Sequence, residues 1–172
     1  IWVKPSTGKD DISLVTKEGQ SIRFSEEDVR PMGRNAAGVR GIKLHEKDEV
    51  VGMDVINPVL ADKGKLALFV VMENGLGKRT DVSEYKTQGR GGSGIRTARV
   101  TDKTGGVVGA YISSADDERD IVLISKKGIV VRTPFKNTPL LGRDTQGVRI
   151  MRFKEEGDAL STVTFVNHDE IV

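Results

Sequence analysis

The sequence contains no cysteine, which excludes a disulfide framework and any thiolate metal site. The same absence fits a reducing cytoplasm, which is the compartment we expect. No apolar run approaches the roughly 18 residues that a membrane helix requires, and we expect no signal peptide. Because the chain starts at Ile1 and not at Met, we expect it to be a piece of a longer protein. The net charge of +2 predicts no class of partner by itself.

Enzymatic signatures are also missing. The two histidines, His45 and His168, lie in charged turns with no cysteine beside them, so no metal site is predicted. The glycine-rich stretch 89–94 lacks the G-K-[ST] end of a phosphate-binding loop. No serine lies in a nucleophile elbow, and the acids show no pairing for acid–base chemistry. We therefore expect neither catalytic nor metal-binding residues in this chain.

One eight-residue pattern, G-R-x-x-x-G-[VI]-R, occurs three times. The copies cover residues 33–40, 89–96 and 142–149. In each copy, the first glycine follows a hairpin glycine by the same interval, as in Gly19 to Gly33 and Gly75 to Gly89. Recurrence at a fixed period is typical of repeat architectures. The three patterns, named here the arginine loops, divide the chain into repeats over about 11–57, 65–115 and 120–166.

Each repeat is predicted to hold four short strands in about 53 residues, which is typical of a propeller blade. Turns at Gly19, Gly75 and Gly128 join the first two strands. The third strands are expected over 39–44, 95–100 and 148–153, and the fourth over 50–56, 107–113 and 160–166. Ser25 is expected to cap a short helical turn. The predicted fold class is all-β and propeller-like, with all of residues 1–172 in one unit.

The arginine loops are the candidate binding site. Arginine forks match phosphate geometry, and neighbouring glycines let backbone approach a ligand closely. A repeated arginine would form a basic belt suited to duplex DNA, while the scarcity of aromatics in the loops argues against single-strand stacking. The first candidates for phosphate contact are Arg34, Arg40, Arg90, Arg96, Arg143 and Arg149. The second group of candidates is Arg23, Lys78, Arg79 and Arg132. The alternative role of these four residues is to face a neighbouring blade.

Two other functions stay open at this point. In the first, the arginines pair with acids of adjacent blades, and the propeller binds a protein. Pairing of Glu26, Asp81 and Asp144 with the arginine loops would favour that interpretation. In the second, a hydrolase site lies in the central channel, although no sequence motif supports it.

The arginine loops and their flanks resemble the C-terminal domain of the A subunit of DNA gyrase. The resemblance rests on 28–34 with 37–42, on 75–80 with 84–85, and on 142–149. The A subunit of topoisomerase IV is a close relative and the alternative within the family. A seven-residue stretch also resembles the family's Q-R-R-G-G-[KR]-G box, departing from it at Gly89 and Ser93. This box-like loop is Gln88, Gly89, Arg90, Gly91, Gly92, Ser93 and Gly94.

The resemblance implies a β-pinwheel, in which blades exchange strands and the outer rim binds and bends duplex DNA. It implies that the parent is a type II topoisomerase that uses ATP and Mg through other domains. Its partners would be the B subunit of gyrase and a second A subunit. The family's cleavage tyrosine lies in another domain, so Tyr85 is expected to be a packing residue and this piece to be non-catalytic.

Overall fold

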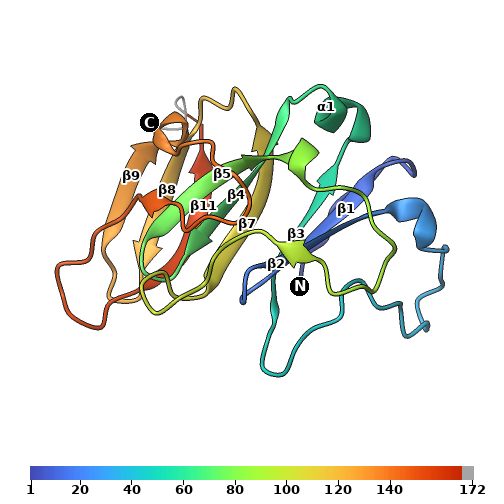
Figure 1. The fold of residues 1–172 in the computed structure, drawn as a ribbon, viewed down its shortest axis with the longest axis horizontal. Helices are drawn as coiled ribbons and strands as arrows, with labels where there is room; N and C mark the ends of the chain where they lie inside the picture. Colours follow the sequence, from blue (N-terminus) through green and yellow to red (C-terminus); the bar gives the residue numbers. More distant parts are fainter. Residues whose placement is uncertain (168–172) are drawn as a thin grey trace.

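Three antiparallel sheets follow one another along the chain in the computed structural model, which describes residues 1–167 (Figure 1). The first sheet has the order β3-β1-β2-β6, the second β10-β5-β4-β7, and the third β11-β8-β9. The strands are β1 (Asp11–Thr16), β2 (Gln20–Ser25), β3 (Val50–Ile56), β4 (Leu66–Met72), β5 (Leu76–Asp81), β6 (Ile95–Arg96), β7 (Val107–Ser114), β8 (Asp120–Ser125), β9 (Val130–Pro134), β10 (Val148–Arg149) and β11 (Leu160–Val166). The all-β prediction is confirmed.

Every sheet contains a hairpin of its first two strands, and a glycine permits the turn of that hairpin. Gly19, Gly75 and Gly128 have φ angles of +81°, +76° and +84°, a region that residues with a Cβ atom rarely adopt. The strands that meet at these turns are β1 with β2, β4 with β5, and β8 with β9. The predicted hairpin turns are therefore confirmed, and their physical cause is the left-handed glycine.

In each four-stranded sheet, the edge strand beside the second strand of the hairpin comes from the following repeat. Strand β6 pairs with β2 through Ile95 and Ser21, and β10 pairs with β5 through Val148 and Gly77. Just beyond β6, the N–H groups of Thr97 and Ala98 both donate to the Gly19 carbonyl, at 2.8 and 3.3 Å. The Gly75 carbonyl accepts from the corresponding two residues of the next repeat. This arrangement of exchanged strands is that of a β-pinwheel.

The predicted third strands are largely wrong in extent. Residues 39–44 form no strand, while 95–100 and 148–153 contribute only the two residues of β6 and of β10. Each of the segments 95–100 and 148–153 pairs with the edge strand of the preceding sheet for only two residues. Beyond those two residues, two consecutive N–H groups donate to a single carbonyl, and the regular pairing ends. The segment 39–44 has no preceding sheet among residues 1–167.

Short helical elements occupy the connections. The 3₁₀ turns are η1 (Glu26–Asp28), η2 (Val82–Glu84) and η3 (Phe135–Asn137), and the helix is α1 (Pro58–Asp62). The cap predicted at Ser25 is confirmed, because its side chain accepts from the Glu27 N–H. Helix α1, capped by Asn57, was not predicted because five residues give no helical period. Among the described residues, no helix is long and apolar enough to cross a membrane.

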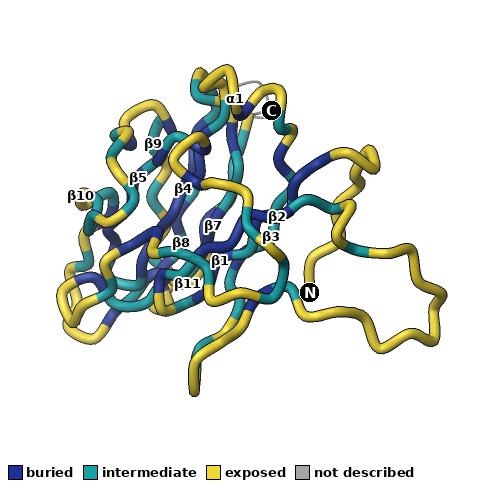
Figure 2. The backbone as a smooth tube through the Cα atoms, turned by 45° about the vertical axis from the view of Figure 1, so that its right-hand side comes forward, coloured by how far each residue is buried: buried dark blue, intermediate teal, exposed yellow. Residues whose placement is uncertain are grey.

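The buried core runs between the sheets as well as within them (Figure 2). One cluster joins the first two sheets and includes Val15, Leu68 and Tyr85. A second joins the second and third sheets around Phe69 and Phe135, whose rings meet edge to face at 5.1 Å. Because adjacent sheets share apolar side chains as well as a strand, each repeat is stabilised by its neighbours.

We expect Gly94→Ala to lower the free energy of unfolding by about 1 kcal/mol or more. Gly94 has φ of +72°, and an added Cβ would press against the Ser21 carbonyl that faces the exchanged strand. Urea unfolding would measure the change. Gly89→Ala is the matched control, because its Cβ would meet nothing within 4 Å. Equal stability of the two variants would contradict the importance of this close approach.

Candidate nucleic-acid interface

The last arginine of every arginine loop is exposed to solvent. Arg40, Arg96 and Arg149 occupy the same position in successive repeats, two residues after the second loop glycine. Arg96 and Arg149 are the final residues of the exchanged strands β6 and β10, so the pairing of those strands fixes where their side chains start. Repetition along the sheets therefore produces a row of guanidinium groups at the surface.

The first arginine of the loop has a different role in the second and third repeats. The Arg90 Nη1 atom donates to the Arg40 carbonyl at 2.6 Å, and the Arg143 Nη1 atom donates to the Arg96 carbonyl at 3.1 Å. Each of these half-buried side chains therefore ties its own loop to the loop before it. In the first repeat, the exposed Arg34 side chain makes no hydrogen bond or ion pair with the described residues.

Arg23 and Arg79 lie between repeats. Arg23 is buried, pairs with Asp11 at 2.6 Å and donates to the Tyr85 carbonyl at 3.2 Å. The half-buried Arg79 donates to the Thr138 carbonyl at 2.7 Å. In both cases the carbonyl belongs to the residue four before the loop glycine of the next repeat. These contacts fit the alternative role of facing a neighbouring blade, and we leave both arginines out of the proposed surface.

Lys78 is fully buried beneath the third arginine loop. Its Nζ atom donates to the Gly142 carbonyl at 2.7 Å and also to the Arg143 carbonyl. Burial lowers the pKa of Lys78 from 10.5 to about 8, because the charged amine loses its hydration. With no exposed surface, this side chain cannot reach a phosphate in the described structure, and it supports the loop from below.

Arg132 is exposed, unlike its counterparts Arg23 and Arg79. Its Nε atom lies 2.7 Å from Asp120 in the same hairpin, and no carbonyl of a following repeat is present among residues 1–167. Its exposure is therefore explained by its place on the last hairpin.

Of the three acids that would favour structural pairing, one contacts the arginine row. Asp144 lies 3.5 Å from Arg96 and 3.5 Å from Arg99, with all three side chains about half exposed. A hydrogen bond from Arg99 holds the pKa of Asp144 below its usual range. By contrast, Glu26 accepts from the Asp10 N–H and Asp81 from the Ser83 N–H. The arginines are therefore not broadly neutralised by these acids.

The box-like loop is held against the first repeat by its backbone. The Gln88 N–H donates to the Arg23 carbonyl at 2.7 Å, and the Gly91 N–H to the Gly41 carbonyl at 2.7 Å. The Gly92 carbonyl accepts from Lys43 at 2.8 Å. Several polar backbone groups in this loop thus form a joint between repeats, while Gly89, Gly92 and Ser93 remain exposed.

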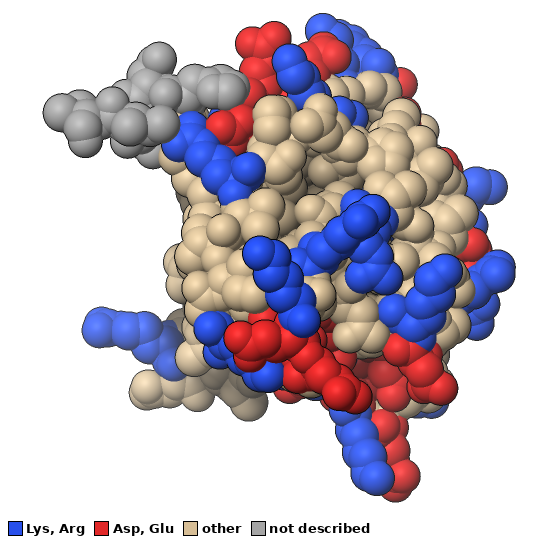
Figure 3. Space-filling model, turned by 90° about the vertical axis from the view of Figure 1, so that its left-hand side faces the viewer, with Lys and Arg blue, Asp and Glu red and all other residues tan. Residues whose placement is uncertain are grey.

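Basic side chains outside the arginine loops add to this surface. Arg99 is exposed and donates to Asp144. It was not among the candidates predicted from the sequence, although its position three residues after Arg96 was a usable signal. Figure 3 shows Lys and Arg side chains over an uncharged area in the middle of one face, with acidic side chains mainly around that area.

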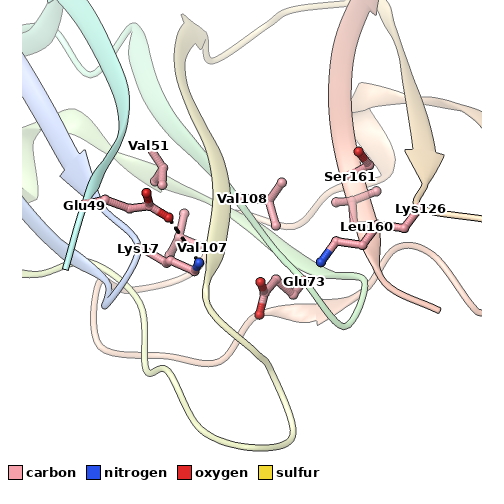
Figure 4. A pocket seen from close by; sticks show the side chains of 9 residues that line it. All are labelled: Lys17, Glu49, Val51, Glu73, Val107, Val108, Lys126, Leu160 and Ser161. Atoms are coloured by element: carbon pink, nitrogen blue, oxygen red, sulfur yellow. Dashed lines mark hydrogen bonds and ion pairs between the residues drawn. The ribbon is translucent and has the colours of Figure 1, made fainter. Parts of the chain in front are cut away.

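A small pocket lies where the hairpin turns of the three sheets approach one another (Figure 4). Its volume is about 180 Å³, below the range of typical small-molecule sites. Lys17 and Glu49 form an ion pair on one side of it at 3.1 Å, while Glu73 and Lys126 line the other side. No histidine lines this pocket.

The histidines and Tyr85 are the remaining titratable candidates in the sequence. Within the described part of the chain, no group of three His, Asp or Glu residues could hold a metal ion; His168 lies outside it. Tyr85 is buried in the core shared by the first two sheets, and its hydroxyl lies 2.6 Å from that of Thr97. Burial raises the pKa of Tyr85 to about 12. The packing role of Tyr85 is confirmed.

The model of the family described as "DNA gyrase C-terminal domain, beta-propeller" matches residues 10–57, 68–114 and 119–167. The chain belongs to this family. The three matched segments are the three repeats, each with its own arginine loop. The recognised resemblance and the pinwheel fold are both confirmed.

The chain is also similar to DNA gyrase A subunits. The chain is 42% identical over 170 residues to the A subunit of DNA gyrase from Staphylococcus epidermidis (strain ATCC 12228), and 40% identical over 169 residues to that of Staphylococcus aureus (strain MRSA252). These alignments cover 99% and 98% of this chain but only 18% of each relative. The chain therefore spans about a fifth of the length of the curated relatives it matches.

Solved structures agree on the fold. A DNA gyrase A C-terminal domain matches 93% of this chain and 52% of its own, with a TM-score of 0.79 and 27% identity. The C-terminal domain of a DNA topoisomerase IV has the same TM-score at 23% identity, covering 93% of this chain and 47% of its own. The second likeness shows the fold alone.

We expect the stability of the wild type to rise relative to Lys78→Met as the pH increases from about 7.5 to 9.5. Between the folded pKa of about 8 and the ordinary value of 10.5, the unfolded chain binds a proton that the folded chain does not. Urea unfolding at several pH values would measure the difference between the two free energies. A difference that does not change with pH would contradict the lowered pKa.

Proposed function

We propose that this chain binds duplex DNA, without sequence preference, through the row formed by Arg40, Arg96 and Arg149. The observation that supports the proposal is that the first and last arginines of the arginine loop have different roles. Arg90 and Arg143 are used to join loops, whereas the last arginine of every loop stays exposed. Exposed guanidinium groups at a repeated interval suit the phosphates of a polyanion. Arg34 and Arg99 extend the row.

The shape of the molecule supports contact with an extended ligand. Figure 1 shows the three arginine loops in the order of the sheets, from the blue-green part of the chain to the orange part. A duplex that touches all three therefore follows the row of sheets. Arg132 and Lys78, which were candidates, are not needed for this contact.

We further propose that the DNA is bent around the pinwheel and that the parent is the A subunit of DNA gyrase, a type II topoisomerase. The support is the 40–42% identity to proteins with that name. In that setting the piece is non-catalytic and supports ATP-dependent negative supercoiling. The use of ATP and Mg, and the contacts with the B subunit of gyrase and with a second A subunit, belong to the rest of the parent. The topoisomerase IV A subunit is the alternative within the same class.

We expect Arg40→Ala, Arg96→Ala and Arg149→Ala each to weaken DNA binding equally on unrelated sequences. If each arginine contacts one phosphate, each change should reduce the slope of log K against log salt by about 0.9. Fluorescence anisotropy with a labelled duplex across a salt series would measure the slope. Lys63→Ala is the matched control, because this exposed base lies beyond helix α1, outside the loops. An unchanged slope in the triple variant would exclude the row as the binding site.

Bending is tested separately by the length of the DNA. We expect affinity to increase from a duplex that spans one loop to one that spans all three, and the ends of the longer duplex to approach one another in a fluorescence energy-transfer assay. Salt-dependent binding without end approach would mean contact without wrapping. No binding at low salt would favour the protein-interaction module, with Asp144 among its structural partners.

A further inference from the structure

A second basic position recurs in every repeat. Three residues after the last arginine of each loop, the chain carries another lysine or arginine, and its side chain is exposed in all three repeats. Each repeat therefore presents two exposed bases, named here a basic pair. The basic pairs are Arg40 with Lys43, Arg96 with Arg99, and Arg149 with Arg152. Two such bases can hold the oxygens of one phosphate between them.

The joints between repeats place the first two basic pairs in the same way. One contact is the hydrogen bond from the first arginine of a loop to the last arginine carbonyl of the loop before it. The other contact uses the second base of the pair. Its N–H donates to the next loop: Lys43 to the Gly92 carbonyl at 2.8 Å, and Arg99 to the Thr145 carbonyl at 3.1 Å. In both joints, the next loop therefore lies against the basic pair through equivalent contacts.

One loop residue differs between the two joints. Two residues after the first loop glycine, the second loop has Gly91 and the third loop has Asp144. A Cβ atom added at Gly91 would lie 4.0 Å from the Arg40 Cγ atom, so this position faces the basic pair. Within residues 1–167, the side chains of Arg40 and Lys43 make no hydrogen bond or ion pair. The first basic pair is thus free of an acid, whereas the second faces one.

The Asp144 carboxylate bridges the second basic pair. One of its oxygens lies 3.5 Å from the Arg96 Nη1 atom, and the other lies 3.5 Å from the Arg99 Nη2 atom. A carboxylate and a phosphate both present paired anionic oxygens, and guanidinium groups bind either one with the same N–H groups. The carboxylate therefore occupies the position that a phosphate in contact with both arginines would take.

We propose that Asp144 competes with DNA for Arg96 and Arg99, so that a phosphate binds this pair only after it has displaced the carboxylate. The inference rests on the proposed function, because it concerns the same surface and the same ligand. The pair of Arg40 and Lys43, which has Gly91 beside it, binds a phosphate without this competition. Two adjacent repeats with equivalent backbone contacts thus differ in their affinity for DNA.

The exposure of these side chains allows the displacement. The side chains of Arg96, Arg99 and Asp144 are 56%, 54% and 49% exposed. Water and salt therefore screen both ion pairs, and neither contributes much to stability. The joint does not depend on the carboxylate, because the Arg143 guanidinium and the Arg99 N–H hold the third loop through backbone carbonyls. Asp144 can leave the arginines while the loop stays in place.

Asp144→Asn tests the competition, since asparagine keeps the shape of the side chain and removes its charge. We expect this variant to bind a labelled duplex about fivefold more tightly than the wild type at low salt, measured by fluorescence anisotropy. The slope of log K against log salt should become steeper by up to about 0.9, because the pair then neutralises one more phosphate. Asp62→Asn is the matched control for net charge, because this exposed acid lies in helix α1, outside the loops.

Two further comparisons connect the effect to the basic pairs. In a chain that carries Arg96→Ala and Arg99→Ala, adding Asp144→Asn should give no gain beyond that of Asp62→Asn. An acid can also be placed in the first joint. Gly91→Asp should weaken DNA binding relative to Gly91→Asn, which imposes a similar strain at φ of +81° without the charge.

The outcomes separate this inference from the proposed function. If the wild type binds duplex DNA and Asp144→Asn binds no more tightly than Asp62→Asn, the competition is refuted and the proposed function stands. Weaker binding by Asp144→Asn would mean that the carboxylate positions the loop, which also refutes the competition. A gain that persists without Arg96 and Arg99 would refute the role of this pair. If no form of the chain binds duplex DNA at low salt, the proposed function and this inference both fail.

Discussion

The joint between successive repeats is the interaction on which the rest of the structure depends. A two-residue strand alone contributes little to a sheet, yet β6 and β10 are held because arginine–carbonyl contacts act beside them. Arg23 and Arg90 each contact backbone of an adjacent repeat, and Tyr85 and Phe69 pack in the cores between sheets. Pairing, charge-assisted hydrogen bonds and apolar burial thus stabilise the same boundary.

The same joint explains how one motif performs two tasks. A loop that carries two arginines uses the first to fix its position against the loop before it and presents the second to solvent. In the third repeat, the buried Lys78 amine supports Arg143 from below through the Gly142 and Arg143 carbonyls. The exposed row at Arg96 and Arg149 is therefore carried on rigid backbone, which limits the entropy lost when a ligand is bound.

The repeat, the hairpins and the class of fold could be predicted from the sequence, because they depend on local features such as Gly19 and on a period that is visible without coordinates. The different roles of the two arginines within one loop could not. Arg90 and Arg96 are equal candidates in the sequence, and only the packing of their loop against the loop before it half-buries the first and leaves the second exposed. The prediction of a strand over 39–44 was wrong for the same kind of reason, since the pairing of this segment depends on another sheet.

Exchange of strands also constrains the order in which the chain can fold. Strand β2 ends at Ser25, but the strand that completes its sheet begins at Ile95. During synthesis the first sheet therefore stays incomplete until most of the second repeat has been made, and the second sheet waits in the same way for β10. Such non-local pairing slows folding, and it exposes a strand edge for the whole interval. A nascent chain with this topology is therefore most prone to aggregate after one repeat has been made and before the next repeat supplies the strand that completes its sheet.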